Sequence, residues 1–292
     1  TKLNSYLLMS KKIFLSTGGF SKQKPEDTAN LFLKNNIVNI ELSSGKHSNQ
    51  NLNEIIKLKK KCNFVLHNYF PPPKKPFVMN LASKNKSIFK QTRNLILKSI
   101  KFSKKVNSNY YAFHAGFCFD PDIKKLGQTF KKTKLLSRKI TINIFKKRVL
   151  EINRLIKDKK FNLLIENNVI TKKNYDRFGC NPLLLTNPKE IRDFFKKMPK
   201  NIGLLLDVGH LKVSAETEGF SAKNAMNKLK PFIKGYHLSE NSGFVDNNKA
   251  INKNSWFIPY LKKNVKYITL EVDTPSVIKL KKQINLAERI LT

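Results

Sequence analysis

The chain has 292 residues and a formal net charge of +37 at pH 7, and 40% of its residues are hydrophobic. This apolar content is enough for a sizeable core, which argues against wholesale disorder, and the length suits one large domain. No apolar run approaches the ~18 residues of a membrane-spanning helix, so we expect no membrane partner.

The first residues of the chain precede Met9-Ser10-Lys11-Lys12. Because that tetrapeptide resembles a natural start, we expect residues 1–8 to be a non-native or disordered leader and residues 9–292 to form the folded domain. The apolar residues 6–9 are too few for the hydrophobic region of a signal peptide.

After this leader, short β-like runs alternate with longer amphipathic stretches. The predicted strands comprise residues 13–16, 38–42, 64–66, 110–113, 162–165, 203–206, 232–236 and 267–270. The predicted helices comprise residues 25–34, 52–61, 86–105, 141–157, 188–197, 222–229, 256–262 and 275–290. Continuous apolar strands are typical of a buried parallel sheet, and eight alternating βα units close a barrel. We therefore predict a single (β/α)8 TIM barrel of the α/β class.

Local signals support two of the helix starts. Asn187-Pro188 with Glu190 predicts an N-cap followed by a proline in the first turn, and Thr274-Pro275 repeats the cap and proline. Residues 120–137 are long for a βα loop, and they predict a lid or a short extra helix.

The three cysteines, Cys62, Cys118 and Cys180, form no CxxC pair. Their number and spacing indicate neither a disulfide framework nor a structural zinc site. We expect free thiols in a reducing, cytoplasmic environment.

The positive charge has two interpretations. It could attract phosphate, on nucleic acid or on a small substrate. However, lysines occur on nearly every predicted helix and accompany abundant Asn and Ile, whose codons are also A/T-rich. We therefore favour composition bias, because a nucleic-acid-binding protein concentrates its charge on one face.

Polar residues interrupt the ends of six successive predicted strands. They are His67, His114, Glu166, Asp207 (with His210 three residues on), His237 and Glu271. In a barrel, the C-terminal ends of the strands meet at one mouth, where barrel enzymes place their sites. His47 does not directly follow a predicted strand and has no such polar residues near it in the pattern, so we expect it at the surface.

The clustering of these groups predicts a metal site. Burying three carboxylates together with several imidazoles is costly unless a cation or protons balance them. Imidazole and carboxylate ligands favour zinc or manganese as the divalent cofactor, with cobalt or magnesium as alternatives.

Four motifs lie at these strand ends in a particular order. They are HNY…NLAS (residues 67–83), FHAG (113–116), IEN (165–167) and LDVGH (206–210). Through them the sequence resembles the xylose isomerase-like TIM barrel superfamily, from Ile13 to about Leu291. That superfamily includes sugar-phosphate isomerases and epimerases as well as the endonuclease IV class of apurinic-site (AP) endonucleases, also called AP endonuclease family 2.

In the isomerase interpretation, the resemblance implies one metal held by four residues: Glu166, Asp207, His237 and Glu271. The metal would polarise the carbonyl and hydroxyl of a sugar, and the catalytic residues Glu166 and Glu271 would move a proton through an enediolate. His210 would contact the substrate, and His67 and His114 would line the pocket. The family usually has a cationic residue shortly after the histidine of strand seven, but residues 238–243 include none.

In the endonuclease interpretation, the resemblance implies three zinc ions. His67, His114 and Glu166 would hold one, and Glu166 would share a second with Asp207, His237 and Glu271. His210 would hold the third together with Asp246, but Asn248 stands where a histidine ligand is expected. The proline-rich residues 71–76 fall where this class presents a DNA-penetrating loop.

We prefer the sugar interpretation because Asn248 breaks the third zinc site, whereas composition bias explains the charge. The expected partner is then a small sugar or sugar phosphate, within carbohydrate metabolism, and nucleic acid is the second choice. A non-catalytic barrel or another metal-dependent barrel stays open, and an oligomer is compatible with the sequence.

Overall fold

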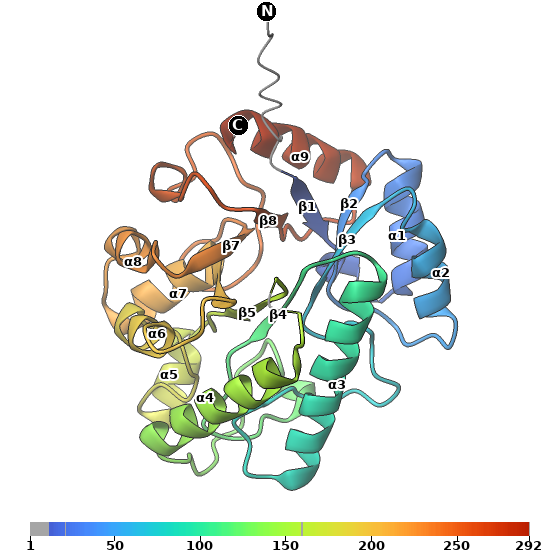
Figure 1. Cartoon of the computed structure of the whole chain (residues 1–292). Coiled ribbons are helices and arrows are strands. Elements are labelled where there is room, and N and C mark those ends of the chain that lie inside the picture. The colour runs from blue at the N-terminus through green and yellow to red at the C-terminus, as the bar shows by residue number, and fades with distance from the viewer. Residues whose placement is uncertain (1–11, 21, 159, 292) are drawn as a thin grey trace, which may run out of the picture.

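The computed structural model describes residues 12–20, 22–158 and 160–291. Within them, parallel strands form a closed barrel in the order β1-β2-β3-β4-β5-β6-β7-β8, which confirms the predicted fold. The strands are β1 (Ile13–Ser16), β2 (Asn39–Leu42), β3 (Asn63–His67), β4 (Tyr110–His114), β5 (Asn162–Glu166), β6 (Ile202–Asp207), β7 (Ile233–Leu238) and β8 (Tyr267–Leu270). Figure 1 shows these strands at the centre of the molecule with the helices around them.

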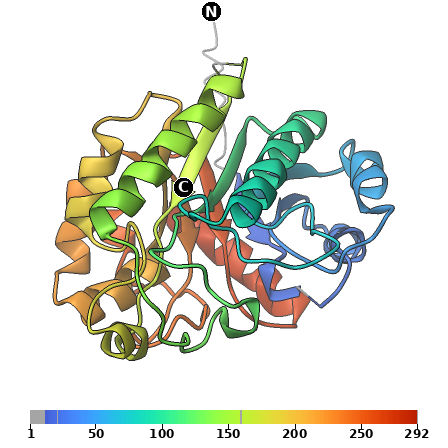
Figure 2. The same cartoon turned by 90° about the horizontal axis from the view of Figure 1, so that it is seen from below.

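The helices cover the outside of the barrel. They are α1 (Pro25–Lys34), α2 (Asn51–Leu58), α3 (Lys86–Lys105), α4 (Arg138–Leu155), α5 (Lys172–Phe178), α6 (Pro188–Phe195), α7 (Val208–Glu218), α8 (Ala222–Leu229) and α9 (Val277–Leu291). Figure 2 shows α3 and α4, the two longest, on the outer side of the strands.

The barrel interior is apolar below its mouth. Phe14, Val65, Tyr110, Ala112, Leu164 and Leu205 form a buried cluster that comes from strands alone. Because side chains two residues apart on a strand face the same side, the next inward position after Leu164 is Glu166, and after Leu205 it is Asp207. The alternation of each strand therefore places its last polar residue in the mouth.

The strict alternation of strands and helices was wrong in three places. α5 and α7 are additional helices, and in the described chain the β7–β8 connection contains only the 3₁₀ turn Ile258–Tyr260. Pro259 explains that turn, because a helix starting at Trp256 would need a backbone N–H at the fourth position. α7 escaped prediction because it is buried on several sides and lacks an amphipathic pattern.

The structure agrees with one local prediction and refines two others. The side chain of Asn187 caps α6 by accepting a hydrogen bond from the Glu190 backbone N–H at 3.0 Å. α9 starts at Val277, two residues later than the proline signal suggested. Residues 120–137 contain one 3₁₀ turn, Ile123–Lys125, and are otherwise irregular.

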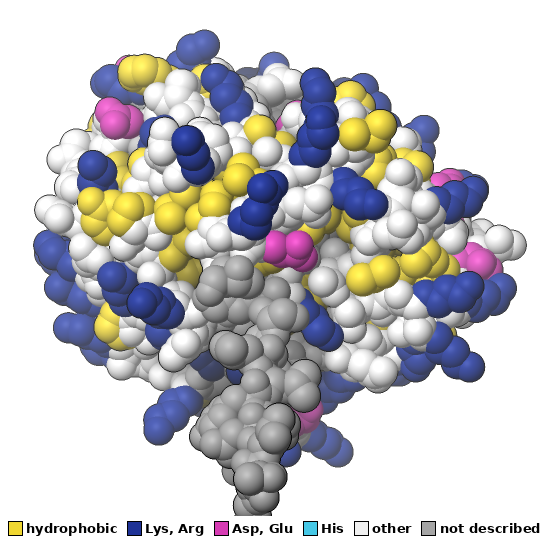
Figure 3. Space-filling view, turned by 90° about the horizontal axis from the view of Figure 1, so that it is seen from above, with side chains coloured by type: hydrophobic (Ala, Val, Ile, Leu, Met, Phe, Trp, Pro, Cys, Tyr) yellow, Lys and Arg dark blue, Asp and Glu magenta, His cyan; other side chains and the backbone are white. Residues whose placement is uncertain are grey.

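Several other sequence predictions concern the chain start, membrane spans, cysteines and surface charge. Residues 1–8, the expected leader, lie outside the described residues. Among the described helices, none is long and apolar enough to cross a membrane. Cys62 and Cys118 are buried, Cys180 is exposed, and all three are free thiols. Figure 3 shows one side of the molecule, on which Lys and Arg side chains are dispersed among apolar and neutral ones.

Candidate metal centre

The strand-end residues converge at the C-terminal mouth of the barrel. Glu166, Asp207 and His237 are fully buried, and His67 is nearly so. The Glu271 side chain is 17% exposed and that of His114 is 30% exposed, so these two form the solvent side of the cluster. The structure therefore brings together every strand-end residue singled out in the sequence.

Four of these residues form a core group: Glu166, Asp207, His237 and Glu271. One ligating atom from each lies within 4.8 Å of the others. His237 Nδ1 is 2.9 Å from Glu271 Oε2, 3.3 Å from Glu166 Oε1 and 3.9 Å from Asp207 Oδ2. Ligands of a tetrahedral zinc ion are typically about 3.4 Å apart, given bonds of about 2.0–2.2 Å. The group therefore has the spacing of a metal site.

Two buried carboxylate oxygens in this core group have no hydrogen-bond partner among the described residues. They are Glu166 Oε1 and Asp207 Oδ2. Buried polar atoms are almost always paired, and an exception calls for an explanation such as an ion. The core group could therefore hold a divalent metal.

A second group shares Glu166 with the first. His67 Nε2 lies 2.5 Å from Glu166 Oε2, and His114 Nδ1 lies 3.3 Å from the same oxygen. These three residues could also hold a metal. Because Glu166 turns one oxygen to each group, it could bridge two ions.

His210 is held beside both groups at the start of α7. Its backbone N–H donates to Asp207 Oδ1 at 2.7 Å, so Asp207 caps the helix with one oxygen while the other faces the core group. His210 Nδ1 lies 2.9 Å from the Asn167 carbonyl oxygen, and Nε2 lies 3.1 Å from Asp246 Oδ2. His210 and Asp246 thus lie together.

Asn248 does not complete a third group with this pair. Its Oδ1 accepts a hydrogen bond from Ser239 Oγ at 3.2 Å, and its backbone has a φ of 41°. In the part of the chain that the structure describes, His210 and Asp246 belong to no group of three ligating side chains.

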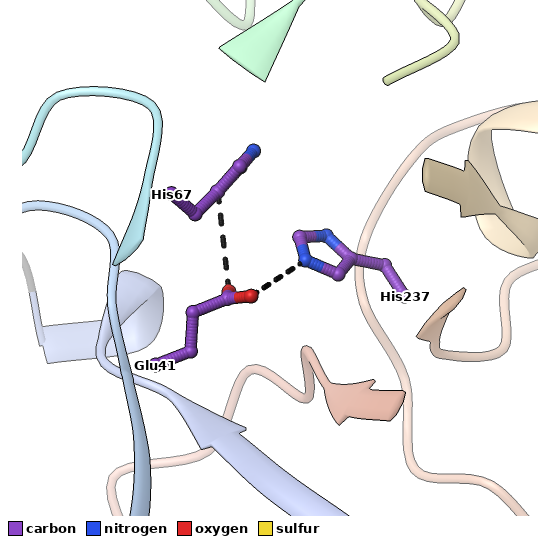
Figure 4. A group of neighbouring side chains, drawn as sticks. All are labelled: Glu41, His67 and His237. Carbon is purple, nitrogen blue, oxygen red and sulfur yellow. Dashed lines mark hydrogen bonds and ion pairs between the residues drawn. The ribbon is translucent and has the colours of Figure 1, made fainter. Parts of the chain in front are cut away.

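Glu41 is the site residue that sequence reasoning missed. It is fully buried on β2, where its Oε2 lies 3.0 Å from His237 Nε2 and accepts a hydrogen bond from Thr269 Oγ1 at 2.9 Å. Glu41, His67 and His237 form a third group, in which one ligating atom from each residue lies within 4.8 Å of the others (Figure 4). The available signal was a carboxylate at an inward position within an otherwise apolar strand.

Burial and nearby charges shift the pKa values of the buried carboxylates in opposite directions. Burial raises the pKa of Asp207 to about 7, and the nearby Asp246, Glu166 and Glu271 add to this rise. Burial also raises the pKa of Glu271, but the charge and hydrogen bond of His237 outweigh it and bring the pKa to about 2. The pKa of Glu166 is lowered like that of Glu271. Burial raises it, but the effects of three histidines are larger and hold it well below the ordinary value.

The pKa values of the histidines are also shifted in opposite directions. Burial lowers the pKa of His237, but Glu41, Glu271 and Glu166 raise it well above the ordinary value. Burial dominates at His114 and lowers its pKa to about 4. In the protein alone, protons on the imidazoles therefore balance the carboxylates, and a cation could replace them.

A small cavity adjoins Glu271 between the ends of β1 and β8. Its volume is about 120 Å³, and it is lined by Ser16, Gly18, Gly19, Asn248, Glu271, Val272 and Asp273. A Cβ atom on Gly18 would lie 3.1 Å from Glu271 Oε1. A glycine at position 18 therefore keeps the space beside that carboxylate open.

Among the described residues, His47 and the proline-rich segment belong to none of these groups. His47 is exposed, and its Nδ1 lies 3.0 Å from the Pro72 carbonyl oxygen. Pro71 and Pro72 are buried, whereas Lys74 and Lys75 are exposed. The expected surface position of His47 is confirmed.

The family model described as "Xylose isomerase-like TIM barrel" matches residues 40–271. The chain belongs to this family. The resemblance inferred from the strand-end motifs is thus confirmed. A search of curated proteins found no match.

Solved structures share the fold of this family member. A D-tagatose 3-epimerase-like protein has a TM-score of 0.70 and 19% identity, over 96% of this chain and 98% of the other. The 3-keto-D-glucoside 4-epimerase YcjR from E. coli has a TM-score of 0.65 and 10% identity, over 96% and 99%. The IolI protein with a bound zinc atom has a TM-score of 0.64 and 13% identity, over 96% of both chains.

Proposed function

We propose that this protein is a divalent-metal-dependent isomerase or epimerase of a sugar or sugar phosphate. The observation that carries the proposal is the core group, in which three carboxylates and His237 turn ligating atoms toward one point. Two solved relatives of the same fold are named as sugar epimerases or epimerase-like, and a third carries zinc, which supports both parts of the proposal.

The donor set fits a zinc or manganese ion, with cobalt or magnesium as alternatives, because imidazole and carboxylate oxygen are both present. Glu166, Asp207, His237 and Glu271 would hold the ion, and the unpartnered Glu166 Oε1 and Asp207 Oδ2 are two of its natural ligands. When bound, the ion would act as a Lewis acid toward the carbonyl and neighbouring hydroxyl of a sugar.

Glu166 and Glu271 would be the catalytic proton carriers. Their low pKa values keep both carboxylates ionised at neutral pH, so each can accept a proton. One removes the proton from the carbon beside the sugar carbonyl, which leaves an enediolate. If the other carboxylate has taken a proton from solvent, it would deliver that proton to the opposite face of the same carbon, which gives the epimer. Return of a proton to the neighbouring carbon, with transfer of the hydroxyl proton from one sugar oxygen to the other, would give the isomer.

The surroundings fit a polar substrate of modest size. Glu271 borders the 120 Å³ cavity, whose lining adds the polar side chains of Ser16, Asn248 and Asp273. These groups can donate or accept hydrogen bonds to sugar hydroxyls. His210 faces the same mouth and would contact the substrate through Nε2, which lies beside Asp246.

Solvent exchange tests this proposal directly. The metal-replete protein is incubated in D₂O with a panel of ketoses, aldoses and their phosphates, and deuterium at the carbon beside the carbonyl is followed by NMR. We expect incorporation with at least one sugar, and its loss in Glu166→Gln and Glu271→Gln. Glu26→Gln, at a buried glutamate on α1, is the matched control. Absence of exchange across the panel would refute the proposal.

One observation favours a second candidate, zinc-dependent cleavage at abasic sites in DNA. The group of His67, His114 and Glu166 shares Glu166 with the core group, so two ions could flank a phosphate. The pair of His210 and Asp246, without a third ligand in the described chain, argues against a three-zinc centre. Cleavage of an abasic duplex that is lost in Glu271→Gln would replace the sugar proposal with this one.

A further inference from the structure

Glu41 lies one layer below the mouth, where no solvent reaches it. The sheet register pairs it with Val65 rather than with His67, and its exposed fraction is 0%. A buried carboxylate is costly unless it is hydrogen-bonded or paired. Its contacts should therefore explain why a glutamate occupies this position.

Those contacts reach the far side of the His237 ring. Glu41 Oε2 is 3.0 Å from His237 Nε2, whereas the other ring nitrogen, Nδ1, faces Glu166 and Glu271 at 3.3 and 2.9 Å. Thr269 Oγ1 donates to the same Glu41 oxygen at 2.9 Å and fixes the carboxylate. Figure 4 shows the carboxylate between the two imidazoles, with a dashed line to each.

Glu41 on β2 and Ser43, just after the end of that strand, contact His67 in a similar way. His67 Nδ1 lies 3.1 Å from Ser43 Oγ and 3.9 Å from Glu41 Oε1, while Nε2 points to Glu166. Glu41 and Ser43 are two residues apart and so reach the same side of the sheet. Each imidazole is thus held by the nitrogen that faces away from Glu166.

We propose that Glu41 is a positioning residue that holds His237 as the tautomer with its proton on Nε2. That tautomer leaves the lone pair of Nδ1 free for a cation in the core group, and the Glu41 carboxylate makes the imidazole a stronger donor to it. Ser43 and Glu41 together fix His67 for the second group. This inference rests on the metal dependence of the proposed function and extends it to a residue that would not touch the ion.

The opposite assignment, with Glu41, His67 and His237 as ligands themselves, uses the other nitrogen of each ring. It would use Glu41 Oε1, which has no hydrogen-bond partner among the described residues, since Oε2 already has two hydrogen-bonding neighbours, His237 Nε2 and Thr269 Oγ1. It is disfavoured because it would take the His237 nitrogen that Glu41 Oε2 already contacts, and because it offers three ligating side chains, whereas the core group offers four. The two assignments predict different metal stoichiometry, which makes them separable.

The decisive experiment measures metal binding by calorimetry and chelator competition in the wild-type protein and in Glu41→Gln. We expect the same number of zinc ions per chain in both and a dissociation constant about 10–100-fold higher in the variant, as is typical for a group that orients a ligand. Glu26→Gln, a buried glutamate on α1, should change neither quantity. Loss of one ion per chain in Glu41→Gln, with the remaining affinity unchanged, would make Glu41 a ligand and overturn the inference.

A second measurement needs no variant at Glu41. In ¹⁵N-labelled, zinc-loaded wild-type protein, two-bond ¹H–¹⁵N spectra assigned with His237→Gln should show the His237 proton on Nε2. A proton on Nδ1 would refute the inference even if Glu41→Gln failed to fold. Wild-type protein that binds no divalent metal would instead refute the proposed function, so the two failures are distinguishable.

Discussion

The same strands form two contrasting regions, the apolar interior and the charged mouth. On a given strand, a residue of the interior and a residue of the mouth are two positions apart. Leu164 is fully buried among strand residues in the interior, and Glu166, next on the same face of β5, is fully buried among ionisable groups. The first region is held by apolar packing, although the Tyr110 hydroxyl in it has no hydrogen-bond partner, whereas in the second region two carboxylate oxygens, Glu166 Oε1 and Asp207 Oδ2, have none in the described chain. The contrast indicates that the interior stabilises the barrel and the mouth is shaped for a ligand.

The largest effect that would test this contrast is on turnover. In Glu271→Gln, we expect kcat to fall by about 10²–10⁴-fold, because the variant cannot carry a proton. The melting temperature should fall slightly, because the variant loses the favourable contact between the partly exposed Glu271 carboxylate and His237 that lowers the pKa of Glu271. Steady-state assays with the sugar identified by deuterium exchange, together with thermal unfolding, measure both. A large loss of stability with normal turnover would reverse the roles assigned to the regions.

The matching interior change is Leu164→Ala. It removes a fully buried side chain from the strand cluster, and such a truncation costs about 2–5 kcal/mol of unfolding free energy. Metal stoichiometry at 25 °C should stay the same as long as the barrel remains folded. Urea unfolding and metal analysis of the same sample provide the comparison, and a stable variant that had lost its metal would contradict it.

Acidity should weaken metal binding at the mouth. The pKa of Asp207 is raised to about 7, so below that pH a proton occupies the carboxylate that the ion needs. The raised pKa of His237 acts in the same direction. We expect affinity to increase as the pH rises from about 6 to 8, with proton release visible by calorimetry in buffers of different ionisation enthalpy. An affinity independent of pH would show that neither group binds the ion.

The smallest effect concerns the thiols at the edge of the packed interior. Burial raises the pKa of Cys62 and Cys118, which leaves little thiolate at neutral pH, whereas Cys180 is exposed. Iodoacetamide should therefore modify Cys180 first and reach the other two only on unfolding, as peptide mass spectrometry can follow. Early modification of Cys118 would indicate local opening beside the mouth.

Much of this barrel was predictable because its signals are local. Each strand is a short apolar run, and the strand-end residues stand out because a histidine or carboxylate follows that run directly. Parallel topology then brings those ends together, so their proximity follows from the fold alone.

The features that escaped prediction depend on tertiary contacts. Glu41 lies within a strand, and only the register shows that it reaches His237 across the barrel. Asn248 pairs with Ser239 and has a backbone φ of 41°, and residue types reveal neither feature. Helix α7 shows no amphipathic period because most of its residues, 208–211 and 213–215, are buried.

The two carboxylate oxygens of Asp207 have different surroundings. One oxygen caps α7 through the His210 backbone N–H at 2.7 Å, and the other faces the core group. The cap stops the carboxylate from rotating, so the loss of side-chain entropy occurs when the chain folds and does not have to accompany ion capture. The N-terminal end of α7 thus holds the Asp207 carboxylate in a fixed orientation. Any ion bound there would be linked through Asp207 to the position of the whole helix.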